Sequence, residues 1–393
     1  MKWPAQRLLS QAGKGFGMYE VAARLQSSGA DVIHLEVGRP ADDTPTHIKE
    51  AAKAALDAGI VHYGDLQGTL GLREALAGRY REQQGLAVTP AEILVTNGVT
   101  QGAFAAFMAA IDPGDEVIVL EPWYPQHNSK IELVGGRVVT VSMRRVNGAY
   151  RLDPERLEAA ITPRTRMVVL INPTNPTGTV YSAVELHALA QICIRHDLLV
   201  LSDEVYEYIT FDGHRHISMA TLPGMRERTI TVSAFTKAYA MDGWRQGYVM
   251  ATVPIIADLR KVTMNDTTHP CVFAQEGARA AVVGPRECLV EMVARDRARR
   301  DLAVSRLNAM PGVSCAVPQA TIYAFPDVRS FGLGSDELAL AILEGAHVAV
   351  ESGAFYGPSG EGHLRVCFAS EHYERVAEGM TRIASFLASL QRP

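Results

Sequence analysis

The chain has 393 residues, enough for a large domain and a smaller one with ample hydrophobic core. Charged residues make up 21% and hydrophobic residues 47%, which is ordinary for a globular protein. The net charge of −5 offers no basic field for nucleic acid and no polybasic anchor for a membrane, so we expect neither as a partner.

The sequence also indicates the cell compartment. The first 17 residues lack a continuous apolar stretch of the kind found in secretory signals, and the most apolar run, Ala103–Ile111, is too short to span a bilayer. The five cysteines are scattered without a C-x-x-C spacing, which favours reduced core thiols over a disulfide frame or a metal site. We therefore expect a cytoplasmic protein without a bound metal.

In chain order, the pattern predicts a leading arm, a helix over 19–26, a strand over 32–37, a Gly/Pro/Asp loop at 38–45 and a helix over 46–58. A Gly-rich turn then leads into a helix near residue 76. From there short apolar strands alternate with helices; the strands are predicted at 93–96, 117–120, 167–171, 198–201, 229–232 and 247–251. This alternation predicts an α/β fold with a mostly parallel sheet covered on both faces.

The C-terminal part begins with a long helical region over 285–310. Strands are predicted near 322–325, 348–351 and 364–368, and an amphipathic helix closes the chain. We expect the N-terminal segment and this part to form a smaller second domain together.

Polar residues follow several of the predicted strands. The turn 97–102 opens a helix and its free N–H groups suit a phosphate, while Tyr124 could stack on a planar ligand. The Pro-rich turn 172–178 holds two asparagines that suit a phenolate oxygen. Asp203 ends an apolar strand, where a buried carboxylate needs a cationic partner, either an arginine or a protonated pyridine nitrogen. Since ligands of open α/β sheets gather at the carboxyl ends of the strands, these residues predict a site.

The segment 233–248, SAFTKAYAMDGWRQGY, carries the strongest chemical signal. Lys237 lies just after a strand among apolar and hydroxyl residues, and Arg245 follows eight positions later. A lysine that loses hydration has a lowered pKa, and its neutral amine attacks carbonyls. A phosphate-bearing aldehyde would use both the lysine and the arginine.

With this segment in place, the chain resembles the fold-type I, class I/II aminotransferases, which use pyridoxal 5'-phosphate. The resemblance runs from VGRPADDTP (37–45) to HLRVCFA (363–369). It implies a large domain with a mostly parallel central sheet flanked by helices, and a smaller α/β domain built from both termini. The implied division is an N-terminal arm and part of the small domain at 1–45, a large cofactor domain at 46–288 and the C-terminal small domain at 289–393.

The resemblance also implies roles for individual residues. Lys237 would hold the cofactor as a Schiff base and move the substrate α-proton, and Asp203 would pair with the pyridine nitrogen. Arg365 would clamp the substrate carboxylate, with Gly38 close to the substrate. The remaining contacts to the cofactor ring would be Asn175 and Tyr206 at the phenolic oxygen and Tyr124 on the ring face. The contacts to its phosphate would be Val99, Thr100, Gln101, Ser233, Thr236 and Arg245, together with Tyr63 from a neighbouring subunit. A contact made by Tyr63 across subunits would require a homodimer with shared sites.

Arg39 stands where many relatives have an acidic or amide residue. It could form a loop salt bridge with Asp42 or Asp43, or it could face the side chain of an acidic substrate. Another departure is PQATIYAFP (318–326), where Ala320 and Ile322 replace the usual Gly and Phe.

Three functions are compatible with a chain of this kind. The first is an aminotransferase of amino-acid metabolism, passing the amino group of an L-amino acid to pyruvate or 2-oxoglutarate by way of pyridoxamine phosphate; an aspartate-type and an aromatic or neutral donor both stay open. The second is a carbon–sulfur β-lyase with the same cofactor residues. The third, a cofactor-sensing regulator, needs a DNA-binding module, and the pattern beginning near residue 32 leaves no room for one. We favour the first.

Overall fold

The structure, a computed structural model, describes residues 3–9, 17–146 and 148–390. Its centre is a sheet that has seven strands among the described residues, in the order β2-β10-β9-β8-β7-β3-β4. The strands are β2 (Ile93–Thr96), β3 (Glu116–Glu121), β4 (Arg137–Ser142), β7 (Thr165–Ile171), β8 (Leu199–Asp203), β9 (Thr229–Ala234) and β10 (Gly247–Met250).

The sheet is mostly parallel, as predicted. Strands β9, β8, β7, β3 and β4 pair in parallel, whereas β10 runs antiparallel to both β9 and β2. The central strands are rich in valine, isoleucine and leucine and are buried along nearly their whole length. Strands buried on both faces lose the polar alternation of a half-exposed sheet, which explains the continuous apolar runs in the sequence.

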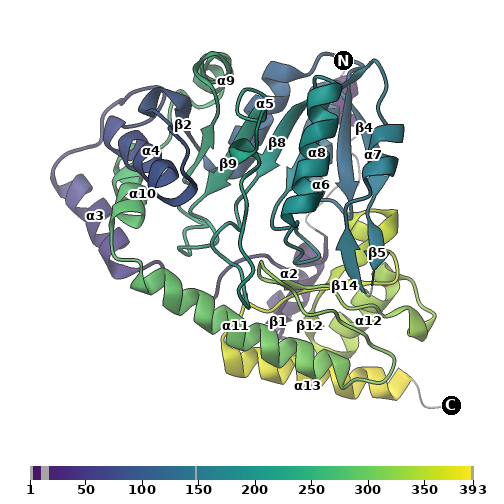
Figure 1. Ribbon diagram of the computed structural model, residues 1–393. Coiled ribbons are helices and arrows are strands. Elements are labelled where there is room, and N and C mark those ends of the chain that lie inside the picture. The colour runs from purple at the N-terminus through teal and green to yellow at the C-terminus, as the bar shows by residue number, and fades with distance from the viewer. Residues whose placement is uncertain (1–2, 10–16, 147, 391–393) are drawn as a thin grey trace.

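Helices cover both faces of this sheet (Figure 1). One face packs on α5 (Gly98–Ala110), α6 (Pro125–Leu133) and α9 (Val253–Asp266) through a core that includes Val117, Val169 and Val249. The opposite face packs on two further groups of helices, namely α8 (Ala183–Arg195) near β7 and β8, and α3 (Thr46–Asp57), α4 (Leu70–Gln84) and α10 (Val272–Val283) near β2 and β10.

A second core joins the two ends of the chain. Strand β1 (Ile33–His34) pairs in parallel with β12 (Val348–Ala349), and β14 (Leu364–Cys367) lies between β11 (Tyr323–Ala324) and β13 (Glu351–Ser352). The helices of this core include α2 (Met18–Ser27), α12 (Ser335–Ala346) and α13 (Tyr373–Leu390). The long helix α11 (Glu287–Asn308) runs along the base of the molecule beside α13 (Figure 1).

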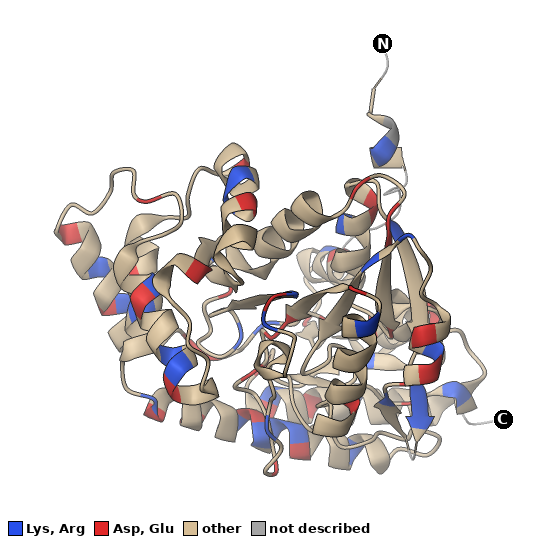
Figure 2. Cartoon of the chain, turned by 45° about the horizontal axis from the view of Figure 1, so that its top comes forward, with Lys and Arg blue, Asp and Glu red and all other residues tan. Residues whose placement is uncertain are grey.

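The shorter elements are α1 (Gln6–Leu9), the hairpin β5 (Arg144–Val146) and β6 (Ala149–Arg151), and α7 (Pro154–Ala159). Figure 2 shows basic and acidic residues interspersed along α11, so the charge there is mixed in sign. Among the described residues, no helix combines the length and the apolar character needed to cross a membrane.

Candidate active site

The carboxyl ends of the parallel strands lie at one edge of the sheet, and the turns that leave them carry most of the predicted site. β3 leads to Tyr124, β7 leads to the turn 172–178, β8 ends at Asp203, and β9 leads to Lys237. Because these strands are neighbours and run in parallel, segments far apart in sequence meet at this edge.

Lys237 lies in the turn between β9 and β10 and is partly buried. Its Nζ donates a hydrogen bond to the backbone carbonyl of Gly38. Burial lowers the pKa of Lys237 to about 8, and the positive charges of Arg365 and Arg245 act in the same direction. More of this amine is therefore in its neutral, nucleophilic form near neutral pH than in an ordinary lysine.

Asp203 has a histidine partner that the sequence analysis did not identify. Its Oδ2 lies 3.0 Å from Nε2 of His127 on α6, and its Oδ1 accepts a hydrogen bond from the backbone N–H of Val205 at 3.2 Å. Burial lowers the pKa of His127, although Asp203 opposes this, so the imidazole is neutral and donates through Nε2. The available signal was a histidine one helical turn after Tyr124, whose ring lies 5.3 Å from the imidazole.

This arrangement leaves Asp203 without an ion pair to an arginine or lysine among the described residues. The carboxylate is 4% exposed, its histidine partner is neutral, and in the described part of the chain no arginine or lysine is within ion-pair distance of it. A buried carboxylate of this kind is costly unless a cation joins it. A protonated pyridine nitrogen fits that requirement, which is the first structural observation in favour of the predicted cofactor.

Arg365 on β14 is buried beside two aromatic rings. Its guanidinium lies 4.3 Å from the ring centroid of Tyr323 and 5.0 Å from that of Tyr356, and its Nη1 donates to Oδ1 of Asn175 at 3.3 Å. Nη2 donates to the backbone carbonyl of Glu36, while the buried Nε has no hydrogen-bond partner. A buried, partnerless N–H is expected to meet a ligand, and a carboxylate would satisfy it.

Tyr323 is a second residue that the sequence analysis missed. Its hydroxyl lies 2.8 Å from the hydroxyl of Tyr206, and burial raises the pKa of Tyr323 to about 12, so both phenols keep their protons near neutral pH. Its signal was the tyrosine of PQATIYAFP, in which only the flanking substitutions had been considered.

The two asparagines of the turn 172–178 point in different directions. Asn175 is close to Arg365, as described above. Asn172 points away from it, because its Nδ2 donates to the backbone carbonyl of Ile217 and its Oδ1 accepts from the backbone N–H of Tyr181. Of the two, Asn175 is the one placed beside the other predicted site residues.

The N-terminus of α5 and Arg245 form a cradle for an anion. Arg245 adopts a left-handed backbone conformation, with φ of 55°, and its Nη2 donates to the carbonyl of Asn97 at 3.4 Å. Gly98 has a positive φ of 73°, a backbone conformation that favours glycine at this position. The first N–H groups of α5, which belong to Val99, Thr100 and Gln101, complete the cradle and fit a phosphate.

Other predicted phosphate contacts are placed differently. The Gln101 side chain accepts a hydrogen bond from the backbone N–H of Asn97 and donates one to Asp266. Gln101 can therefore contribute only its backbone N–H to the anion cradle. The Ser233 hydroxyl donates to Glu207 at 3.2 Å, and Thr236 is partly buried next to Lys237. Tyr63 is 90% exposed and contacts His269 edge-on at 5.6 Å; within the described residues it touches none of the other predicted site residues.

The loop 38–43 lies against the site. A Cβ on Gly38 would lie 2.0 Å from the Tyr323 hydroxyl, so the chain needs glycine there. The predicted salt bridge of Arg39 with Asp42 or Asp43 is wrong. Asp42 pairs with Arg295 and Arg299, both at 2.8 Å, Asp43 pairs with Lys49, and Arg39 is exposed and forms no ion pair in the described part of the chain.

Comparison with known proteins identifies close relatives over nearly the whole chain. The family model described as aminotransferase class I and II matches residues 30–383. The chain is 38% identical to an aspartate/prephenate aminotransferase of Cereibacter sphaeroides over 94% of each chain, and 36% identical to aromatic-amino-acid aminotransferase 2 of Thermococcus litoralis over 91% of this chain and 92% of the relative. The crystal structure of the aspartate aminotransferase from Thermus thermophilus with maleate superposes with a TM-score of 0.92 at 35% identity, covering 98% of this chain and all of that one.

Proposed function

The chain belongs to the class I and II aminotransferase family, and from this premise we propose which residues carry the reaction and which substrates enter it. It is a fold-type I, pyridoxal 5'-phosphate-dependent enzyme that transfers the amino group of an amino acid to a 2-oxo acid. The carbon–sulfur β-lyase alternative is not favoured, because the relatives are named for amino-group transfer.

When bound, the cofactor supplies an aldehyde that joins an amine and a protonated ring that draws electrons from the substrate α-carbon. In our proposal Lys237 would hold the aldehyde and, as a free amine, would take the α-proton and return it, because its lowered pKa makes the amine a suitable base. Asp203 would keep the ring nitrogen protonated, and neutral His127 would orient that carboxylate.

The rest of the ring would be held from the sides. Oδ1 of Asn175 accepts a hydrogen bond from Arg365, so Nδ2 can donate to the phenolic oxygen, and the protonated hydroxyl of Tyr206 can donate to the same oxygen. Tyr124 would stack on the ring. The phosphate would be bound by the backbone of Val99, Thr100 and Gln101, the hydroxyls of Thr100 and Thr236, and Arg245. Ser233 would join them if its hydroxyl turned from Glu207 to the phosphate.

We further propose a homodimer in which Tyr63 reaches the phosphate of the neighbouring subunit. Its support is the 90% exposure of a tyrosine in the loop that leads to α4, a helix with one buried face. We propose that the chain divides into domains at 1–45, 46–288 and 289–393, supported by the core that both ends of the chain build together.

The cytoplasm is the proposed location, in keeping with five free cysteines.

For the substrate, we propose an acidic L-amino acid as donor and pyruvate or 2-oxoglutarate as acceptor. Arg365 would bind the α-carboxylate, the Gly38 backbone would lie beside it, and Arg39 would meet the side-chain carboxylate. The observation that carries this choice is the exposed Arg39, whose neighbouring acids pair with other cations. The relatives bear both aspartate and aromatic names, so they favour neither donor class.

The substitution Arg39→Ala tests the donor class. The loss of an exposed ion pair, worth about 1 kcal/mol, should lower kcat/KM for aspartate and glutamate roughly fivefold. The values for alanine and phenylalanine should stay unchanged, and Asp43→Asn, in the same loop, is the matched control. An equal loss with all donors would remove Arg39 from substrate recognition.

A further inference from the structure

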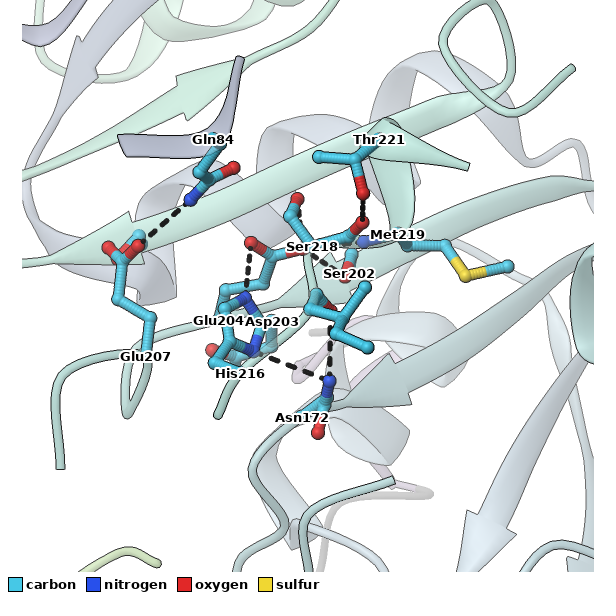
Figure 3. Close-up of polar contacts among 12 residues, drawn as sticks. Gln84, Asn172, Ser202, Asp203, Glu204, Glu207, His216, Ser218, Met219 and Thr221 are labelled. Carbon is cyan, nitrogen blue, oxygen red and sulfur yellow. Dashed lines mark hydrogen bonds and ion pairs between the residues drawn. The ribbon is translucent and has the colours of Figure 1, made fainter. Parts of the chain in front are cut away.

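A cluster of buried polar groups surrounds Glu204, the residue that follows Asp203 (Figure 3). Its centre is the carboxylate of Glu204, which is 1% exposed. Oε1 accepts hydrogen bonds from the Ser202 hydroxyl at 2.8 Å, the Ser218 hydroxyl at 2.9 Å and the backbone N–H of Met219 at 3.3 Å. The other oxygen, Oε2, lies 3.0 Å from Nε2 of His216. The proposed mechanism uses none of these groups.

His216 continues the chain of contacts to the next turn. Its Nδ1 lies 3.3 Å from Nδ2 of Asn172, and Figure 3 shows the imidazole between Glu204 and this amide. The amide orientation of Asn172 is fixed by its bonds to Ile217 and Tyr181, so Nδ2 must be the donor toward His216. The hydrogen bonds therefore have one direction: the amide donates to Nδ1, and Nε2–H donates to Glu204.

Burial and the nearby charged residues have opposing effects on the charge state of His216. Burial opposes a positive charge, but Glu204, with a smaller effect from Glu207, favours it and raises the pKa of His216, while Arg79 acts against it. A second proton would have to sit on Nδ1, where it would face the amide N–H of Asn172. The neutral imidazole is thus the form that keeps both contacts.

The two ends of this chain of contacts belong to the turns that hold the cofactor residues. Glu204 directly follows Asp203, and Asn172 begins the turn in which Asn175 lies three residues later. The turns also touch directly, since the backbone N–H of Asn172 donates to the carbonyl of Asp203 at 3.0 Å. His216 therefore links the two turns through side-chain hydrogen bonds.

We propose that Asn172, His216 and Glu204 form a positioning relay, a hydrogen-bond chain of fixed direction that sets Asp203 and Asn175 at the spacing the cofactor needs. The relay rests on the proposed roles of these two residues. Because it acts through them, its loss should change cofactor binding and turnover directly, and should change the recognition of the substrate carboxylate less, since Arg365 contacts only Asn175 of the two.

Glu204→Gln reverses the polarity of the relay while keeping its shape. With Oε1 still accepting from Ser202 and Ser218, the new amide N–H faces Nε2 of His216, which forces the ring proton to Nδ1 and against the amide of Asn172. We expect the affinity of the apoprotein for pyridoxal 5'-phosphate, measured by fluorescence titration, to fall roughly tenfold to hundredfold. We expect kcat to fall as well, with a smaller change in KM for the amino donor.

Glu116→Gln is the matched control. Glu116 is 3% exposed and, like Glu204, accepts a hydrogen bond from a hydroxyl, that of Thr162 at 2.6 Å. It also accepts one from Arg164 at 2.9 Å, and it lies at the amino end of β3. It should lower the melting temperature comparably and leave cofactor affinity and kcat at wild-type values. An equal loss of cofactor affinity in both variants would reduce the cluster to a structural role.

A double variant tests the direction of the relay. In Glu204→Gln/Asn172→Asp, the proton that moves to Nδ1 of His216 regains an acceptor, so the combined loss of cofactor affinity should be smaller than the product of the two single losses. Independent losses that multiply would overturn the relay. The Asp203→Ala variant separates the two proposals. If this variant keeps wild-type cofactor affinity and activity, the proposed function fails. If Asp203→Ala is defective but Glu204→Gln is not, only the relay fails.

Discussion

Arg365→Lys is the substitution whose effect the structure defines most closely. The arginine donates to Asn175 and to the Glu36 carbonyl, stacks on Tyr323, and keeps a buried Nε without a partner. A lysine keeps the positive charge but offers a single nitrogen, so it cannot hold these two groups and also bind a carboxylate through two parallel bonds.

The expected magnitude follows from the bonds that are lost. A hydrogen bond to a charged group contributes about 1.5–3 kcal/mol, and the lysine loses one of the two parallel bonds to the substrate carboxylate, or about 1.5–3 kcal/mol. At about 1.4 kcal/mol per factor of ten, kcat/KM should fall roughly 10- to 150-fold. Since every amino acid has the same α-carboxylate, the loss should be similar for aspartate, alanine and phenylalanine.

The assay is the rate of the amino-donor half-reaction, followed by the absorbance of the bound cofactor under single-turnover conditions. An amine without a carboxylate, such as phenethylamine, is the internal control, because its slow reaction should not change in the variant. The reasoning would be refuted by a loss below about threefold, or by a loss confined to donors with one type of side chain.

Two further predictions concern the lysine and the histidine of the site. The rate at which pyridoxal 5'-phosphate becomes linked to Lys237 in the apoprotein, measured by stopped-flow absorbance, should rise with pH and level off above about 8. The reason is that the neutral amine is the reacting form and its pKa is lowered to about 8. A rate that continues to rise to pH 10 would mean that Lys237 has the pKa of an ordinary lysine. His127→Phe removes the hydrogen bond to Asp203 and should lower kcat roughly tenfold with little change in KM; steady-state kinetics giving a wild-type kcat would exclude an orienting role for His127.

The sheet could be predicted because its central strands are buried on both faces. Runs such as Met167–Ile171 and Thr229–Val232 are apolar or β-branched throughout, and the structure places β7 and β9 over them. The edge strand β4 was not predicted, since its Arg137 and Thr140 are exposed and interrupt the apolar run. The antiparallel direction of β10 depends on the path of the turn after β9, which local sequence does not specify.

The site was predicted as far as strand ends could indicate it. Asp203, Asn175 and Lys237 each follow a recognisable strand, so their meeting at one edge follows from the parallel order. His127 and Tyr323 could not be found in this way. His127 lies on a helix and faces Asp203 only because α6 packs under the sheet, and Tyr323 meets Tyr206 and Arg365 only once β11 pairs with β14.

Asn172 and Arg39 show what sequence spacing leaves open. The residue pattern of the turn 172–178 does not by itself distinguish the roles of its two asparagines. In the structure, the hydrogen bonds of Asn172 to Ile217 and Tyr181 point its side chain away from Arg365. The acids next to Arg39 looked like its partners, but Asp42 is bound by two arginines of α11, which lies more than 250 positions away in sequence. Contacts of that separation are fixed by tertiary packing alone.

The most direct test of the account is the visible spectrum of the cofactor-loaded protein during titration with single L-amino acids, without a 2-oxo acid. We expect the band of the lysine-bound cofactor to convert to pyridoxamine 5'-phosphate, with one 2-oxo acid released per site, no ammonia, and the fastest conversion with aspartate or glutamate. Lys237→Ala should show no conversion. A band that persists while ammonia and 2-oxo acid accumulate beyond one equivalent per site would contradict amino-group transfer.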